Sequence, residues 1–97
     1  MSMVVGVLTI ELWFPGTHSL KGKRKLLQKI IERTRSRYNV SIAEVSDNDL
    51  WQRTLIGISV VSNGTDHIHS TLDNITNFIT NLHVGEVIST QVESLSF

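Results

Sequence analysis

The sequence predicts an α+β fold in which two helices cover one face of a four-stranded antiparallel sheet. Hydrophobic residues alternate in four segments, which is the period of a half-buried strand. In two other segments they recur at spacings of three and four, which is the period of an amphipathic helix. The segments follow one another as strand, helix, strand, strand, helix, strand. That order is typical of a ferredoxin-like βαββαβ sandwich, and a length of 97 residues suits a single such domain, residues 1–97.

A change of period marks the first strand and the first helix. Residues 3–14 alternate, and the even-numbered positions are predicted to face the core. Pro15-Gly16 breaks the strand, and Ser19 is the predicted N-cap of a helix that runs to about Arg37. The apolar residues of this helix share one side, which we expect to face the sheet: Leu20, Leu26, Leu27, Ile30, Ile31 and Thr34.

The remaining elements follow from composition and spacing. Residues 39–45 and 51–62 read as strands, separated by a turn at Asp47-Asn48-Asp49. The cluster Asn63-Gly64-Thr65 ends the third strand and begins a second helix. Residues 84–95 alternate again and form the last strand. The second helix is recognised from the spacing of its apolar residues: Ile68, Leu72, Ile75, Ile79 and Leu82.

Charge is concentrated in the first helix. Eight of the nine basic residues lie between Lys21 and Arg37, against the single acid Glu32, although the formal charge of the whole chain is zero. Lysines near a helix N-terminus oppose the helix dipole, and like charges four residues apart repel each other. Charged residues on an amphipathic helix are often only its solvated face, but a pattern that opposes helix stability favours an anionic partner. The partner is either internal, in the form of Asp47 and Asp49, or external.

Strand direction brings several polar and aromatic residues to one end of the predicted sheet. The end of the first strand, the start of the first helix and the turn between the second and third strands meet there. Alternation also places several large side chains on the sheet face that the helices leave uncovered. Such a face favours subunit contacts, and its tryptophans also suit stacking against nucleic-acid bases. The candidates for an oligomer interface or for stacking are Trp13, Trp51, Arg53 and Leu55.

The sequence lacks the residues that several classes of catalytic and metal-binding protein require. The chain has no cysteine, which removes disulfides, thiolate nucleophiles and cysteine-ligated zinc. Five residues, not four, separate Gly16 from Gly22, and Arg24 stands where a phosphate loop has Ser or Thr. His67 and His69 are two residues apart on a helix and point away from each other. We therefore expect no catalytic residue, no metal and no cofactor. We also expect a cytoplasmic location without a membrane, because no apolar run is long enough to span one.

Three segments resemble the YlxP-like family of small bacterial proteins of uncharacterised function. They are VVGVLTIELWFPGTHSLKGKRKLL, YNVSIAEV and DLWQRTLIGISVVSN, and the resemblance covers nearly the whole chain. It implies a ferredoxin-like fold, a tendency to self-associate and frequent encoding beside translation and ribosome-maturation genes. The chain departs from the family at Gly22, where the family usually has Glu. That change removes a capping box with Ser19 and leaves the basic segment one charge more positive.

The leading prediction is a non-enzymatic, self-associating protein that binds RNA or a ribosomal particle. One alternative is a homo-oligomeric protein-interaction module without a nucleic-acid role, whose basic helix docks an acidic protein. Another is a sensor that holds a small anion at the start of the first helix. In the leading prediction six side chains contact phosphates irrespective of base sequence: Lys21, Lys23, Arg24, Lys25, Lys29 and Arg33.

Overall fold

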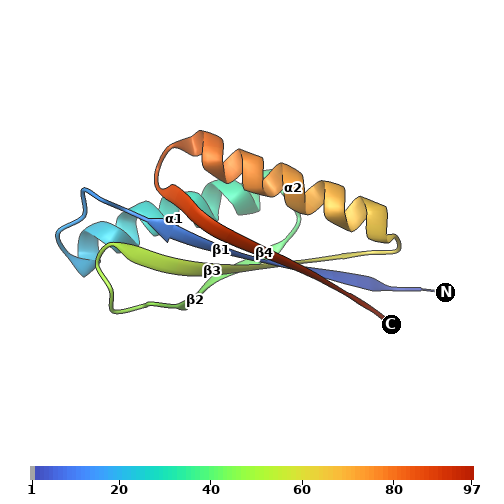
Figure 1. Cartoon of the computed structure of the whole chain (residues 1–97). Helices are drawn as coiled ribbons and strands as arrows, with labels where there is room; N and C mark the ends of the chain where they lie inside the picture. Colours follow the sequence, from blue (N-terminus) through green and yellow to red (C-terminus); the bar gives the residue numbers. More distant parts are fainter. Residues whose placement is uncertain (1) are drawn as a thin grey trace.

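The computed structural model describes residues 2–97 and shows the predicted order of elements (Figure 1). The two helices have the same length, 18 residues each. The elements are β1 Val4–Trp13, α1 Leu20–Arg37, β2 Ser41–Ser46, β3 Arg53–Ser62, α2 Thr65–Leu82 and β4 Glu86–Ser96.

The four strands form one antiparallel sheet in the order β2-β3-β1-β4. The central strand β1 pairs along its whole length with β3 on one side and β4 on the other. Both helices lie on the same face of this sheet, and the two chain ends lie close together at one end of it (Figure 1). Met3 and Phe97 exchange two backbone hydrogen bonds there, of 3.2 and 2.8 Å. The predicted ferredoxin-like α+β fold is confirmed.

The core lies between the sheet and the helices, as the alternation predicted. The even-numbered residues of β1 are buried, and among them Gly6 meets α2 most closely. A Cβ at Gly6 would stand 2.4 Å from the Ile68 side chain, so only glycine lets α2 approach the strand. The apolar side chains from both helices and three strands that form the buried cluster are Val4, Leu8, Ile10, Leu12, Phe14, Leu27, Ile30, Ile42, Ile56, Ile58, Ile68, Leu72, Ile75 and Ile79.

One predicted boundary matters for the functional site. The third strand was expected to begin at Trp51, whereas β3 begins at Arg53 and Trp51 lies in the preceding loop. The loop starts at Asp47, which has a left-handed backbone (φ 63°), and Leu50 donates a backbone hydrogen bond of 3.1 Å to the Asp47 carbonyl. This turn keeps the chain irregular until the Arg53 position pairs with Trp13. Trp51 is therefore outside the sheet face to which alternation had assigned it.

Candidate nucleic-acid interface

The first helix begins at a side-chain cap. Ser19 has an extended backbone, and its hydroxyl accepts a hydrogen bond of 3.0 Å from the backbone N–H of Gly22. The predicted N-cap is thus confirmed, and it satisfies one of the N–H groups that a helix start leaves free. No acidic residue occupies the first turn, so the helix dipole meets no favourable charge there.

Five of the six predicted phosphate-binding side chains lie on the exposed side of α1: Lys21, Arg24, Lys25, Lys29 and Arg33. We call these five residues the basic row. Four of them follow one another at intervals of four residues, which corresponds to about 6 Å of helix axis per step. Within residues 2–97 the ion pairs are Lys23–Glu44 and Arg53–Glu11, so no carboxylate lies within 4.0 Å of a basic-row nitrogen. The charge of the basic row is therefore available to solvent.

The sixth residue, Lys23, corrects the prediction. Its side chain is only 1% exposed, and its ammonium lies 2.9 Å from the Glu44 carboxylate of β2. The same ammonium donates a hydrogen bond to the backbone carbonyl of Asp47, and Thr54 donates one of 2.5 Å to Glu44. Lys23 is thus neutralised inside the protein and is not placed to contact phosphate or a small external anion. It joins the start of α1 to β2 and to the loop that follows.

The spacing of the apolar residues contained the signal for this burial. Lys23 precedes Leu27 by four residues and Ile30 by seven, so it shares their side of the helix. Its residue type nevertheless predicted an exposed side chain, because lysine is almost never fully buried without a partner. The partner, Glu44, lies 21 residues away in β2. The only signal for it in the sequence is that Glu44 follows Ile42 by two residues, so alternation places it on the same side of the strand as a core residue. Of the predicted internal partners, Asp47 contributes its backbone carbonyl to Lys23.

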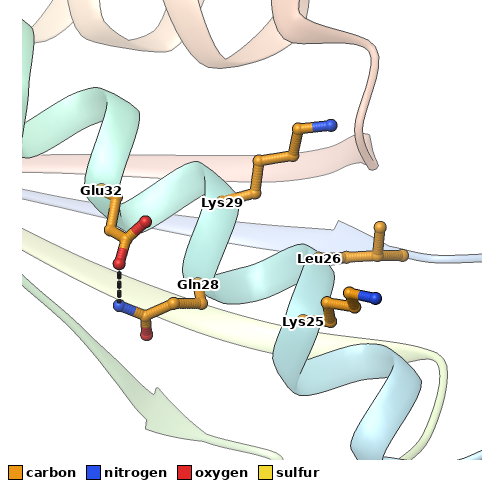
Figure 2. Close-up of a pocket in the computed structure, with 5 residues that line it drawn as sticks. All are labelled: Lys25, Leu26, Gln28, Lys29 and Glu32. Carbon is orange, nitrogen blue, oxygen red and sulfur yellow. Dashed lines mark hydrogen bonds between the residues drawn. The ribbon is translucent and has the colours of Figure 1, made fainter.

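A shallow hollow of about 490 Å³ lies along the basic row (Figure 2). Its apolar wall is the half-buried Leu26, and the ammonium groups of Lys25 and Lys29 stand beside it. Gln28 and Glu32 also line the hollow, and the amide of Gln28 donates a hydrogen bond of 3.0 Å to the Glu32 carboxylate (Figure 2). The hollow therefore combines a small apolar surface with two cations and one carboxylate, and the cations outnumber the carboxylate, which suits a sugar-phosphate backbone.

The loop between β2 and β3 lies next to the start of α1. Trp51 in this loop is 55% exposed, and residues 50–53 line a hollow of about 420 Å³. The Gln52 side chain donates hydrogen bonds of 3.1 Å to the Thr17 carbonyl and 3.4 Å to the Pro15 carbonyl. The structure thus brings Trp51 to the end of the molecule where the basic row begins, as the topology predicted.

The uncovered sheet face holds the other three predicted interface residues. Trp13 is 37% exposed and lies opposite Arg53 in the β1–β3 ladder. Arg53 pairs with Glu11 at 3.3 Å, and Leu55 stands opposite Glu11 and is half-buried. The ion pair divides the apolar residues of this face, so the face is more mixed in polarity than alternation alone indicated. Trp51 is separated from it by two residues.

Within residues 2–97, neither the histidines nor other metal-ligating side chains form a cluster. Among residues 2–97 the structure contains no group of three His, Cys, Asp or Glu side chains that could hold a metal ion. His67 and His69 are both exposed on α2, and His18 is exposed in the turn before α1. A transmembrane helix is likewise not found in the part of the chain that the structure describes.

Solved structures of other proteins share the fold. The de novo designed protein Foldit4 superposes with a TM-score of 0.51 and 16% identity, covering 98% of this chain and 96% of that one. LarC2 is described as the C-terminal domain of a cyclometallase involved in the synthesis of the NPN cofactor of lactate racemase. It superposes in its apo form with a TM-score of 0.50 and 11% identity, over 100% of this chain and 58% of that one. At these identities the likeness concerns the fold alone.

Sequence comparison identifies the family. The uncharacterized protein YlxP of Bacillus subtilis (strain 168) is 36% identical over 76 residues, which are 78% of this chain and 83% of that protein. Residues 5–92 match the model of a family described as "Protein of unknown function (DUF503)". The chain therefore belongs to the DUF503 family, whose members include YlxP-like proteins and whose function is not known.

Proposed function

We propose that this protein binds RNA through the basic row on the exposed side of α1. The observation that carries the proposal is that these five cations are solvent-exposed and lack carboxylate partners within residues 2–97. A helix that keeps unpaired like charges at its dipole-unfavourable end loses stability, and a polyanion compensates that loss on binding. A nucleic-acid backbone binds such a row of cations through its phosphates, irrespective of base sequence.

The basic row is suited to a backbone, not to one small anion. Its cations extend over 13 residues from Lys21 to Arg33, which corresponds to about 18 Å of helix axis. A single phosphate reaches two or three of them at most, whereas a chain of phosphates reaches all five. Lys23, in the first turn of α1 where a small anion would be held, is buried against Glu44. The extended target is therefore favoured over a phosphorylated metabolite.

The test is binding of a fluorescent 12-nucleotide RNA to a variant in which Lys21, Lys25 and Lys29 are replaced by Gln. Each phosphate contact contributes about −0.7 to the slope of log affinity against log salt. The loss of three contacts should therefore lower the affinity at 0.1 M salt, extrapolated from 1 M, by about two logarithmic units, or roughly 100-fold. The matched control replaces Ser70, Asn74 and Asn77 on the exposed side of α2 by Asp, which lowers the net charge by the same three units away from the basic row. Equal losses in both variants would mean that only net charge matters, and unchanged affinity in the first would refute the proposal.

A second candidate function, self-association through the uncovered sheet face, rests on a separate observation. Val61 of β3 is 63% exposed, Leu95 of β4 is 50% exposed, and both lie opposite Val5 of β1. Val45 of β2 is 56% exposed and covers Gly57. Neighbouring apolar side chains such as the half-buried Val5 and the exposed Val61 and Leu95 favour a subunit contact. We expect sedimentation velocity to show an oligomer that Leu55→Asp and Val61→Asp dissociate, and a monomer at all concentrations would exclude it.

A further inference from the structure

The loop between β2 and β3 exposes an aromatic side chain to solvent. Trp51 is 55% exposed although its indole is the largest apolar surface in that loop. A single exposed apolar side chain is common on protein surfaces, and here it leaves the indole accessible to a ligand. Because Trp51 lies outside β3, a sheet-to-sheet contact between two copies does not account for its position.

The loop is fixed to the turn and first residues of α1 by four hydrogen bonds. The Gln52 side chain bonds the carbonyls of Pro15 and Thr17, and the Gln52 carbonyl accepts one of 2.8 Å from the Phe14 N–H. At the other end of the loop, the Lys23 ammonium bonds the Asp47 carbonyl. The loop that carries Trp51 and the start of α1 are therefore held together, and a ligand that reaches both loses little entropy in ordering the backbone.

The surroundings of Trp51 combine apolar surface with positive charge. The hollow of about 420 Å³ is lined by Leu50, Trp51, Gln52 and Arg53. The Arg53 side chain is 52% exposed, so its guanidinium has room for a second partner besides Glu11. An indole beside a cation is the arrangement that stacks a nucleobase while its phosphate is neutralised. The loop also carries the carboxylates of Asp49, which is exposed, and Asp47, which is half-buried, and both act against an anion.

We propose that Trp51 stacks on an unpaired base and that the protein recognises single-stranded RNA in preference to duplex RNA. The proposal rests on the RNA binding proposed above and adds the class of RNA. Base faces in a duplex are stacked on one another and closed to an indole, whereas single strands and loops expose them. Charge alone would favour the duplex, whose phosphate density is higher, so a preference for single strands identifies the contribution of Trp51.

The experiment uses the Trp13→Phe variant, in which Trp51 is the sole tryptophan. A 12-nucleotide oligouridylate should quench its fluorescence, and a 12-base-pair RNA duplex should bind more weakly without quenching. Trp51→Ala should reduce oligouridylate affinity about 5- to 150-fold per stacked base, and Trp51→Phe should retain most of it. Inorganic polyphosphate, which has charge but no bases, should bind wild type and Trp51→Ala equally. Asp49→Asn removes a negative charge from the loop and should therefore strengthen the binding of oligouridylate, of the RNA duplex and of polyphosphate.

The possible results separate this inference from the function on which it rests. Equal affinity for duplex and single strand, with no effect of Trp51→Ala, would overturn the inference and leave RNA binding intact. Absence of binding to every polyanion would overturn both. If Trp51→Ala dissociates an oligomer and leaves oligouridylate affinity unchanged, the indole is a subunit contact and the inference is wrong. Circular dichroism of each variant confirms that the fold is retained.

Discussion

The two helices have the same length and cover the same sheet, yet they differ in where they carry charged side chains. α2 buries an uninterrupted stripe of isoleucine and leucine, and its first turn carries Asp66, which suits the helix dipole. α1 buries Lys23 within its apolar stripe, has no acid in its first turn and exposes the basic row. α2 therefore carries its charge where a stable amphipathic helix favours it, whereas α1 departs from that pattern in its buried Lys23 and in its basic row, which begins in the first turn.

The two departures have different explanations. Lys23 is compensated inside the protein by Glu44 and the Asp47 carbonyl, so its charge serves the structure. The basic row has no such compensation among the described residues, so its charge remains for a partner. Charge on a helix thus indicates function only after burial and pairing have been established, and α1 contains one example of each outcome.

The largest expected effect concerns the buried ion pair. Lys23→Ala leaves the Glu44 carboxylate without its cation and should lower the free energy of unfolding by about 3–5 kcal/mol. Leu72→Ala in the stripe of α2 should cost about 2–5 kcal/mol through its cavity and serves as the apolar reference. Chemical denaturation measures both. The double variant Lys23→Met/Glu44→Gln should recover stability because no buried charge is left unpaired, and a double variant as unstable as Lys23→Ala would contradict this account.

The next effect comes from moving the basic row to the other helix. In the background of the Lys21/Lys25/Lys29→Gln variant, lysines at three exposed α2 positions four residues apart should restore affinity for polyanions by up to roughly 100-fold at 0.1 M salt. The positions are His69, Asp73 and Asn77. The triple variant should bind oligouridylate with little quenching of Trp51, and the lysines on α2 should not restore the quenching, because α2 starts at the opposite end of the sheet from the Trp51 loop. Restored quenching would show that the indole does not depend on α1.

A smaller effect is expected at the start of α1. Ser19→Ala removes the hydroxyl that accepts the Gly22 N–H and should lower stability by about 1 kcal/mol. Thermal denaturation at two salt concentrations is the appropriate measurement, because salt screens the repulsion among the neighbouring lysines but leaves the lost hydrogen bond unchanged. A loss of stability that disappears at high salt would contradict the capping role.

The smallest effect is expected at the start of α2. The N-cap there is Gly64, which makes no side-chain hydrogen bond and has an extended backbone with open space around it. Gly64→Ser should therefore stabilise the protein by a few tenths of a kcal/mol. Chemical denaturation compared with Ser19→Ala tests whether the two helix starts differ as described. Destabilisation by Gly64→Ser would show that the glycine is needed for another reason.

Most of the fold was predictable because hydrophobic period is a local property. Alternation in the strands, three-to-four spacing in the helices and the turn residues between them predicted every element, and the order of elements limited the topology to a known class. The beginning of β3 was misplaced by two residues because the turn after Asp47 depends on a left-handed backbone and on Lys23 from another element. Neither is visible in a window of neighbouring residues.

The candidate site was less predictable than the fold for the same reason. Five of the six basic residues are exposed as expected, and the sequence named them from charge and spacing. Lys23 differs because its partner Glu44 lies across the fold, and pairing over such a distance has no sequence period. The position of Trp51 beside α1 was predicted from topology, but its separation from the sheet face was not.

The central claim is that unpaired cations of the basic row bind phosphates, and the salt dependence of RNA binding tests it most directly. With five cations and about 0.7 per contact, the slope of log affinity against log salt for single-stranded RNA should be about −3.5 in the wild-type protein. In the Lys21/Lys25/Lys29→Gln variant it should fall to about −1.4. Binding that does not respond to salt, or the same slope in both proteins, would contradict the claim.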